Sequence, residues 1–334
     1  MLHVNLFNLI LQINITDIFN NNTIFSSLFD NLYESGVAFI ELLIRGLMFF
    51  VNLFPENIAE PFQYSFMQRA LLTSIIVGLV CGILSCYVVL KRWSLLGDTI
   101  SHAVLPGVAI AYLVGWPFFI GAFITGALTS FGIGIIERNT RIKEDAAMGI
   151  MFTTAFALGV VIISQIATST HLMHILFGNV LGVRMSVLLL TLITGILTVG
   201  ILILFYKEFH LYSFDPIQAN ALGMNTTLLH YSLMLLLTLT IVASLEIVGI
   251  ILVIAMLITP GATAYLLCNN LSTMMFIAGA HGIISSITGL YLSFIFDIAS
   301  GGTIVLVSSL IFCFVFLFSP KEGIIIKLIS AKSS

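Results

Sequence analysis

The sequence has very little charge, because lysine, arginine, aspartate and glutamate together make up only 8% of its 334 residues. Soluble proteins usually carry about 25% of such residues, which keep their surfaces in contact with water. The shortage excludes soluble enzymes and disordered chains. The formal net charge of -3 also gives no sign of the basic surface that binds nucleic acid, so we expect no nucleic-acid partner.

Other signals are missing as well. The four cysteines lie in apolar runs without a C-x-x-C pair, which favours buried hydrophobic side chains over a metal or redox site. No basic residue precedes Arg45, so neither a cleavable signal nor a transit peptide is expected. The phosphate-binding motif G-x-x-x-x-G-K-[ST] is absent, so we expect no ATPase activity in this chain, and any ATP-driven motor would be a separate polypeptide.

Long apolar runs are abundant, and 59% of the residues are hydrophobic. Runs near the length of a membrane span, about 20 residues, fall at 68–90, 94–115, 118–136, 147–167, 186–206, 228–247, 248–268, 272–295 and 302–318. The boundaries at 116 and 247 are soft. The runs predict an all-α polytopic membrane protein with eight to ten transmembrane helices.

Three parts follow from this pattern. Residues 1–60 form an N-terminal extension, in which segment 37–54 is either an extra span or an amphipathic helix at the membrane surface. Residues 63–320 form the transmembrane domain, and residues 321–334 form a cytoplasmic tail. The longest connection, residues 207–227, is the candidate coupling region for a separate motor.

Basic residues in the connections predict the orientation, because lysine and arginine concentrate on the cytoplasmic side. When nine spans are counted, nine of the twelve basic residues share one side. They are Lys91, Arg92, Arg138, Arg141, Lys143, Lys207, Lys321, Lys327 and Lys332. The other side has little beyond Arg69 and Arg184, so we expect the first side to be cytoplasmic.

Within the coupling region, Asp215 followed by Pro216 is typical of a helix start. Ala219 and Gly223 are four residues apart, so a helix through both would present two small residues on one face. Another protein surface could approach that face closely. A plain amphipathic connector has the same pattern, and the residues alone leave both interpretations open.

The segment 94–107, SLLGDTISHAVLPG, is the richest in polar groups inside an apolar run. Asp98 and His102 are four residues apart, so they project from one face of a helix. A helix that is continuous from Arg92 would carry His102 about 15 Å into an apolar slab about 30 Å thick. Pro106, followed by glycine, can break the helix just beyond this pair.

A carboxylate with an imidazole suits a divalent transition metal better than sodium or potassium. One helix supplies only two ligands, but a two-fold homodimer with this helix at its axis would supply two aspartates and two histidines. A self-satisfied Asp98–His102 pair that packs helices together is one alternative, and a proton relay is another.

The run SLLGDTISHAVLPGVAIAYLVG, residues 94–115, resembles the second-span signature of the membrane subunit of manganese/zinc/iron-type ABC importers. Three other stretches resemble the same family in the same order. They are HILFGNVLGV at 174–183, FDPIQANALGMN at 214–225, and VGIILVIAMLITPGATAYLL at 248–267. The resemblance extends from about Gln63 to Pro320 and is greatest to manganese permeases of cyanobacterial type.

This resemblance implies the ABC-importer permease architecture: a homodimer served by an ATP-binding cassette ATPase subunit and by an extracellular or periplasmic metal-binding protein. It implies that Asp98 and His102 contact the metal in the translocation path. It also implies that Asp215, Ala219 and Gly223 belong to the region that contacts the ATPase. The metal would be the transported substrate, manganese or alternatively zinc or iron, and no permanently bound cofactor is expected.

Other polar residues in apolar runs are weaker candidates. Glu246 would attract cations at the outer end of a span, or would be a further metal ligand if the helix continues past it. His174, in an external connection, is either a transient metal contact or a packing residue. We interpret His281 as a packing residue, and we expect no ligand partner near His210 or His230.

The sequence therefore predicts the permease subunit of an ATP-driven divalent-metal importer, a multi-pass protein of a bacterial inner membrane, or of a plastid membrane if plastid-encoded. The competing prediction is a proton-coupled secondary metal transporter in which Asp98, His102 and Glu246 relay protons. The proline breaks at Pro106 and Pro260, in two halves of the chain, are a weak indication of such a carrier.

Overall fold

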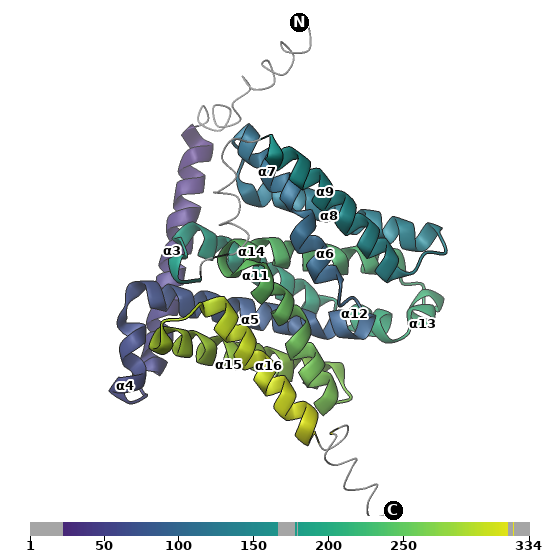
Figure 1. Cartoon of the computed structure of the whole chain (residues 1–334). Coiled ribbons are helices and arrows are strands. Elements are labelled where there is room, and N and C mark those ends of the chain that lie inside the picture. The colour runs from purple at the N-terminus through teal and green to yellow at the C-terminus, as the bar shows by residue number, and fades with distance from the viewer. Residues whose placement is uncertain (1–22, 166–177, 179, 320–322, 324–334) are drawn as a thin grey trace, which may run out of the picture. The chain divides into compact units, whose positions relative to one another are not determined.

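The computed structural model describes residues 23–165, 178, 180–319 and 323, and every regular element within these ranges is a helix (Figure 1). In chain order the elements are α3 (Thr23–Val51), α4 (Glu56–Ala59), η1 (Glu60–Gln63), α5 (Ser65–Lys91), α6 (Leu96–Ala103), α7 (Leu105–Val114), α8 (Phe118–Asn139), α9 (Glu144–Ser164), η2 (Val180–Gly182), α11 (Met185–Leu204), α12 (Tyr206–Phe214), α13 (Pro216–Ala221), α14 (Thr226–Leu267), α15 (Leu271–Phe296) and α16 (Ser300–Phe318). The expected all-α class is confirmed.

The chain divides into two compact units, Met1–Phe54 and Pro55–Ser334. In the first unit, α3 is a single helix of 29 residues that includes most of the candidate segment 37–54. The two alternatives for this segment, an extra span and a helix at the membrane surface, both stay predictions. The second unit contains the span signature and the candidate coupling region, so the functional site is built entirely within it.

Eight helices of the described ranges are long and apolar enough to cross a membrane. They are α5, α6 with α7 as one span, α8, α9, α11, α14, α15 and α16. The expectation of eight to ten spans is confirmed. The chain is a multi-pass integral membrane protein.

Helix α14 is too long for one crossing. Its 42 residues would extend about 63 Å as a straight helix, roughly twice the thickness of the apolar part of a bilayer. The backbone leaves the helical conformation at Gly249, where φ is 75° and ψ is 169°, a region essentially restricted to glycine. Helix α14 therefore consists of two helices, and their junction lies close to the soft boundary expected at residue 247.

Contacts with α5 show that the chain reverses direction at this break. Before the break, His230 lies near Lys91 at the end of α5, because Tyr212 bonds to both residues. After the break, Gly261 packs against the backbone of Ser85, also in the last part of α5. Both ends of α14 therefore lie on the same side, and the eight helices give nine passes within the described residues.

Basic residues from separate connections meet on the side where α5 ends. The guanidinium of Arg138, at the end of α8, donates a hydrogen bond to the Thr227 hydroxyl at the start of α14, and Lys91 bonds to α12. Arg184 lies at the opposite end, beside Glu246 near the break in α14. We refer to the first side as the cytoplasmic side, in agreement with the expected orientation.

Small and hydroxyl side chains join the passes, as is usual for helices packed in a membrane. A Cβ atom on Gly78 of α5 would lie 2.6 Å from the Gly282 oxygen of α15, so these two backbones touch. Ser130 of α8 and Thr238 of α14 share a buried hydrogen bond of 2.7 Å. Such contacts fix the helices that position the polar residues of the site.

Candidate metal site

Asp98 and His102 lie one turn apart on α6 and face each other. Nε2 of His102 is 3.4 Å from Oδ1 of Asp98, and the two side chains are 29% and 47% exposed, in that order. The spacing of four residues predicts this shared face. Because an ionisable group exposed to lipid is costly, a partly open pair within a span is expected to face a water-filled path or another protein chain.

The imidazole of His102 is held by two rings of α9. Phe152 and Phe156 meet it edge to face, with ring centroids 5.3 and 5.6 Å away. These rings restrict the imidazole while Nε2 points toward Asp98. A divalent ion with ligand distances of about 2.1 Å can bridge an oxygen and a nitrogen this far apart, so the pair has suitable geometry for two metal ligands.

The end of α6 is fixed by close backbone packing. Helix α6 ends at Ala103 and α7 begins at Leu105, which confirms the break expected at Pro106. Just beyond it, a Cβ atom on Gly107 would lie 2.1 Å from the Gly121 oxygen of α8. Helix α7 is therefore held directly against α8, and α6 ends at a fixed point.

The expected depth of about 15 Å for His102 is too large. It assumes a continuous helix from Arg92, but Arg92 adopts a left-handed conformation with φ 59° and α6 begins only at Leu96. Helical rise from Leu96 to His102 is about 9 Å. The pair therefore lies inside the span but nearer its cytoplasmic end than the sequence predicts.

No third His, Cys, Asp or Glu joins this pair to form a metal-binding group among the residues that the structure describes. Glu246 is instead placed beside the break in α14, where its Oε1 accepts a 2.7 Å bond from Arg184. Of its two expected positions, the outer end of the span is correct. His174 lies outside the described residues. His281 is buried and its Nε2 is 2.9 Å from the Ser308 hydroxyl, as expected of a packing residue.

Known proteins similar to this chain define its family. The sequence profile of the ABC 3 transport family matches residues 63–319. The chain belongs to this family. The manganese transport system membrane protein MntC of Listeria monocytogenes is 54% identical to it over 263 residues, which cover 79% of this chain and 94% of that protein. The chelated iron transport system membrane protein YfeD of Yersinia pestis is 46% identical over 274 residues, covering 82% and 92%.

A solved structure agrees with this membership. A chain in the structure of PsaBC from Streptococcus pneumoniae in complex with Fab superposes with a TM-score of 0.73 and 40% identity. The match covers 83% of this chain and 99% of that chain. This family member therefore has the fold of an ABC-importer permease, as the resemblance implied.

The candidate coupling region folds as two short helices, α12 and α13, on the cytoplasmic side of the permease. Asp215 caps α13 by accepting a 2.9 Å bond from the Gln218 amide, and Pro216 occupies the first turn, as expected. The expectation that Ala219 and Gly223 share one helix face is wrong. Helix α13 ends at Ala221, and Gly223 follows it in the left-handed conformation, with φ 81°, that commonly ends a helix.

The side chains that the coupling region exposes are apolar rather than small. Ile217 is 83% exposed and Leu222 65% exposed, whereas Ala219 is fully buried. Phe214, at the end of α12, is also exposed. Large apolar side chains that face the aqueous side of a membrane protein mark a surface for another protein. The pattern of small residues in the sequence did not predict these exposed apolar side chains.

Sequence reasoning also missed a polar cluster behind the coupling region. The Tyr212 hydroxyl is 2.8 Å from Nδ1 of His230, and Nε2 of His230 is 3.7 Å from Oε2 of Glu137. His230, for which the sequence predicts no ligand partner, thus has Tyr212 and Glu137 as neighbours. Burial raises the pKa of the Tyr212 phenol, so the hydroxyl stays protonated. The Glu137 carboxylate beside Nε2 favours the tautomer of His230 with its proton on Nε2, and in that tautomer the Tyr212 hydroxyl donates to Nδ1. Residues 137, 212 and 230 are too far apart in the chain for local spacing to reveal this cluster.

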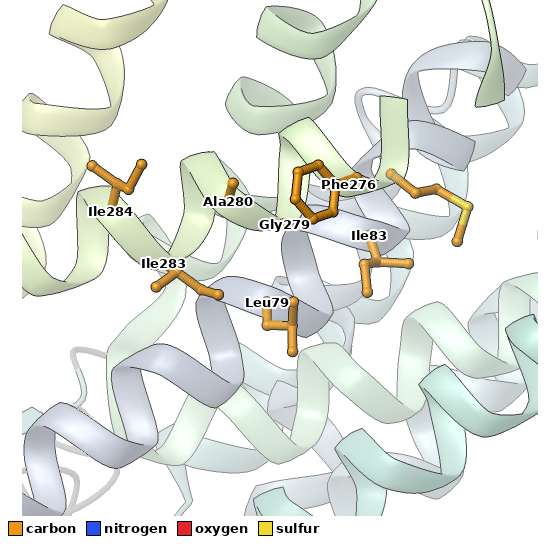
Figure 2. A pocket seen from close by; sticks show the side chains of 8 residues that line it. Leu79, Ile83, Phe276, Gly279, Ala280, Ile283 and Ile284 are labelled. Carbon is orange, nitrogen blue, oxygen red and sulfur yellow. The ribbon is translucent and has the colours of Figure 1, made fainter. Parts of the chain in front are cut away.

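A cavity of about 430 Å³ opens between α5 and α15, and Figure 2 shows the side chains that line it. They are Leu79, Ile83, Met275, Phe276, Gly279, Ala280, Ile283 and Ile284. The lining has no carboxylate, imidazole or thiolate, so this cavity is unsuited to a divalent cation. The Asp98–His102 pair remains the candidate metal site of the permease.

Proposed function

We propose that this chain is the transmembrane permease subunit of an ATP-driven manganese importer of a bacterial inner membrane. The observation that carries the proposal is the Asp98–His102 pair, partly open within an otherwise apolar span. Its membership of the ABC 3 transport family supports transport, and the 54% identity to the manganese transport system membrane protein of Listeria monocytogenes supports manganese. The chain supplies the path, and the metal is the substrate.

A second copy of the chain completes the site. Two ligands are too few for a transported divalent ion, and two copies related by a two-fold axis beside α6 provide two carboxylates and two imidazoles. The partial exposure of both side chains leaves them available to such a partner. Nothing else in the described part of the chain supplies a third ligand to the pair.

The motor and the delivery protein are separate chains. An ATP-binding cassette ATPase subunit docks on the exposed apolar side chains Phe214, Ile217 and Leu222. An extracellular or periplasmic metal-binding protein delivers the ion on the opposite face. ATP binding and hydrolysis move the coupling region, and the two permease copies rock to expose the Asp98–His102 pairs to each side in turn.

Reconstitution tests this function. The permease is placed in liposomes with its ATPase subunit and the metal-binding protein, and uptake of manganese, zinc and iron is measured with ATP and without it. We expect ATP-dependent uptake with manganese preferred. Preference for iron would favour the second candidate, which the 46% identity to the chelated iron protein of Yersinia pestis supports. Uptake driven by a proton gradient without the ATPase would contradict the proposal.

A further inference from the structure

Four polar residues from four helices meet at the cytoplasmic side of the permease. Lys91 ends α5, Glu137 lies near the end of α8, Tyr212 is on α12, and His230 is in the first turns of α14. We name these four residues the cytoplasmic junction. Through Tyr212, the coupling region contacts α5 and α14, and His230 of α14 in turn faces Glu137 of α8.

Two residues bind Tyr212: Lys91 contacts its backbone carbonyl and its ring, and His230 contacts its hydroxyl. The Lys91 ammonium donates a 3.0 Å bond to the Tyr212 carbonyl and lies 3.5 Å from the centroid of its ring. On the other side, the Tyr212 hydroxyl donates to Nδ1 of His230 at 2.8 Å. A half-buried cation over an aromatic face and a buried hydrogen bond both resist displacement. Helix α12 therefore cannot move without moving α5 and α14 or breaking these contacts.

The next contact in the junction is incomplete. With Nδ1 accepting from Tyr212, the proton of neutral His230 is on Nε2, which faces Oε2 of Glu137 at 3.7 Å. Neither atom has a hydrogen-bond partner among the described residues, although His230 is buried with only 4% of its side chain exposed. A buried polar atom without a partner is costly. A shift of less than about 1 Å would close this gap to hydrogen-bond distance.

Helix α13, which carries the exposed Ile217, is stiffly joined to helix α12, which carries Tyr212. The Asp215 amide donates to the Leu211 carbonyl at 2.9 Å, and the Asp215 carboxylate caps α13. Only Asp215 separates the end of α12 from the start of α13. A displacement of the exposed side chain of Ile217 therefore reaches Tyr212 through one short turn held by the hydrogen bonds of Asp215.

We propose that the cytoplasmic junction transmits the movement of the coupling region to the spans, by shifting His230 through Tyr212 until Glu137 and His230 form a hydrogen bond. This inference rests on the proposed function, because the ATPase is what moves the coupling region. The four residues are positioning residues, and they act on the spans without touching the metal. The junction has two arrangements, with the Glu137–His230 gap open or closed, and the ATPase selects between them.

Tyr212→Phe tests the junction in the reconstituted complex of permease, ATPase and metal-binding protein. The variant keeps the ring beneath Lys91 and removes only the hydroxyl that reaches His230. We expect normal affinity for the ATPase and continued ATP hydrolysis, with about fivefold less manganese transported per ATP hydrolysed. Tyr206→Phe is the matched control, because Tyr206 lies on the same helix with its ring beside His210, and its transport ratio is expected to stay normal.

Glu137→Leu extends the test to the gap, because leucine cannot accept a hydrogen bond from Nε2 of His230, and this single variant is also expected to lose about fivefold in transport per ATP. If both residues act through one connection, the double variant Tyr212→Phe/Glu137→Leu should transport about as poorly per ATP as the more severe single variant. If the two effects are independent, the losses in manganese transported per ATP multiply to about 25-fold, and that result would contradict the proposal. A normal ratio in Tyr212→Phe would overturn it too, while leaving the proposed function intact. Failure of the wild-type complex to transport metal with ATP would instead overturn the proposed function.

Discussion

The Asp98–His102 pair and the cytoplasmic junction are both polar clusters in an apolar protein, yet they are built in opposite ways. The pair comes from one turn of α6, and its two side chains are partly exposed. The junction comes from four helices, and its histidine is almost fully buried. A cluster within one turn can bind a substrate without any change in helix packing, whereas a cluster across helices responds to every relative movement of those helices.

This difference predicts where single substitutions will act. Substitution in the pair should remove metal binding and leave assembly intact. Substitution in or near the junction should leave metal binding intact and weaken the link to ATP hydrolysis. The following changes test this division, beginning with the largest expected effect.

Asp98→Asn should reduce manganese uptake to background, because the amide removes the carboxylate charge that a divalent cation requires. The reconstituted complex should still contain the ATPase, measured by co-purification, since Asp98 is half-exposed and lies away from the coupling region. Asp297→Asn is the matched control. Asp297 ends α15 with φ 50°, a conformation that asparagine also adopts readily, so uptake should stay normal. Uptake by Asp98→Asn at the wild-type rate would contradict the site assignment.

Ile217→Asp should weaken binding of the ATPase about tenfold or more, because a charge would replace an exposed apolar side chain at the docking surface. Manganese binding to the permease, measured by calorimetry in detergent, should stay unchanged. Ile298→Asp places the same charge at an exposed position that follows α15 on the opposite side of the membrane, and it should leave ATPase binding normal. Equal ATPase affinity in both variants would show that α13 is not part of the docking surface.

Gly249→Ala should lower the free energy of unfolding by about 1–3 kcal/mol, because an alanine side chain is strained at φ 75° and ψ 169°. Gly178 packs closely against this backbone, since a Cβ atom on Gly178 would lie 2.2 Å from the Gly249 nitrogen. Thermal unfolding in detergent measures the effect. Gly200→Ala provides the comparison, since Gly200 lies within α11 with no atom near the added Cβ, and this change should stabilise slightly. A neutral Gly249→Ala would mean that the chain does not need this backbone conformation.

Glu246→Gln should have the smallest effect. Its partner Arg184 is 73% exposed, and ion pairs of this kind contribute about 0–1 kcal/mol. We expect thermal stability and manganese uptake close to those of wild type, measured in the same assays. A loss of uptake as large as in Asp98→Asn would show that Glu246 belongs to the metal path. Metal binding would then not be confined to the Asp98–His102 pair.

The sequence by itself determined the features that depend on composition and on neighbours along the chain. Apolar runs fixed the spans, including the soft boundary near Gly249, because each span must satisfy its backbone in lipid by forming a helix. The spacing of four residues fixed the shared face of Asp98 and His102, and Asp215 with Pro216 fixed the start of α13. These are local effects, so no knowledge of packing is needed to predict them.

Only the tertiary structure decided the features that depend on helices distant in the chain. It placed Glu246 beside Arg184, it moved His102 toward the cytoplasmic end by ending α5 at Lys91, and it buried Ala219 while exposing Ile217. It also brought Glu137, Tyr212 and His230 together. Periodicity along one helix gives the direction of a side chain around its axis, but the partner in that direction is set by which helices pack there.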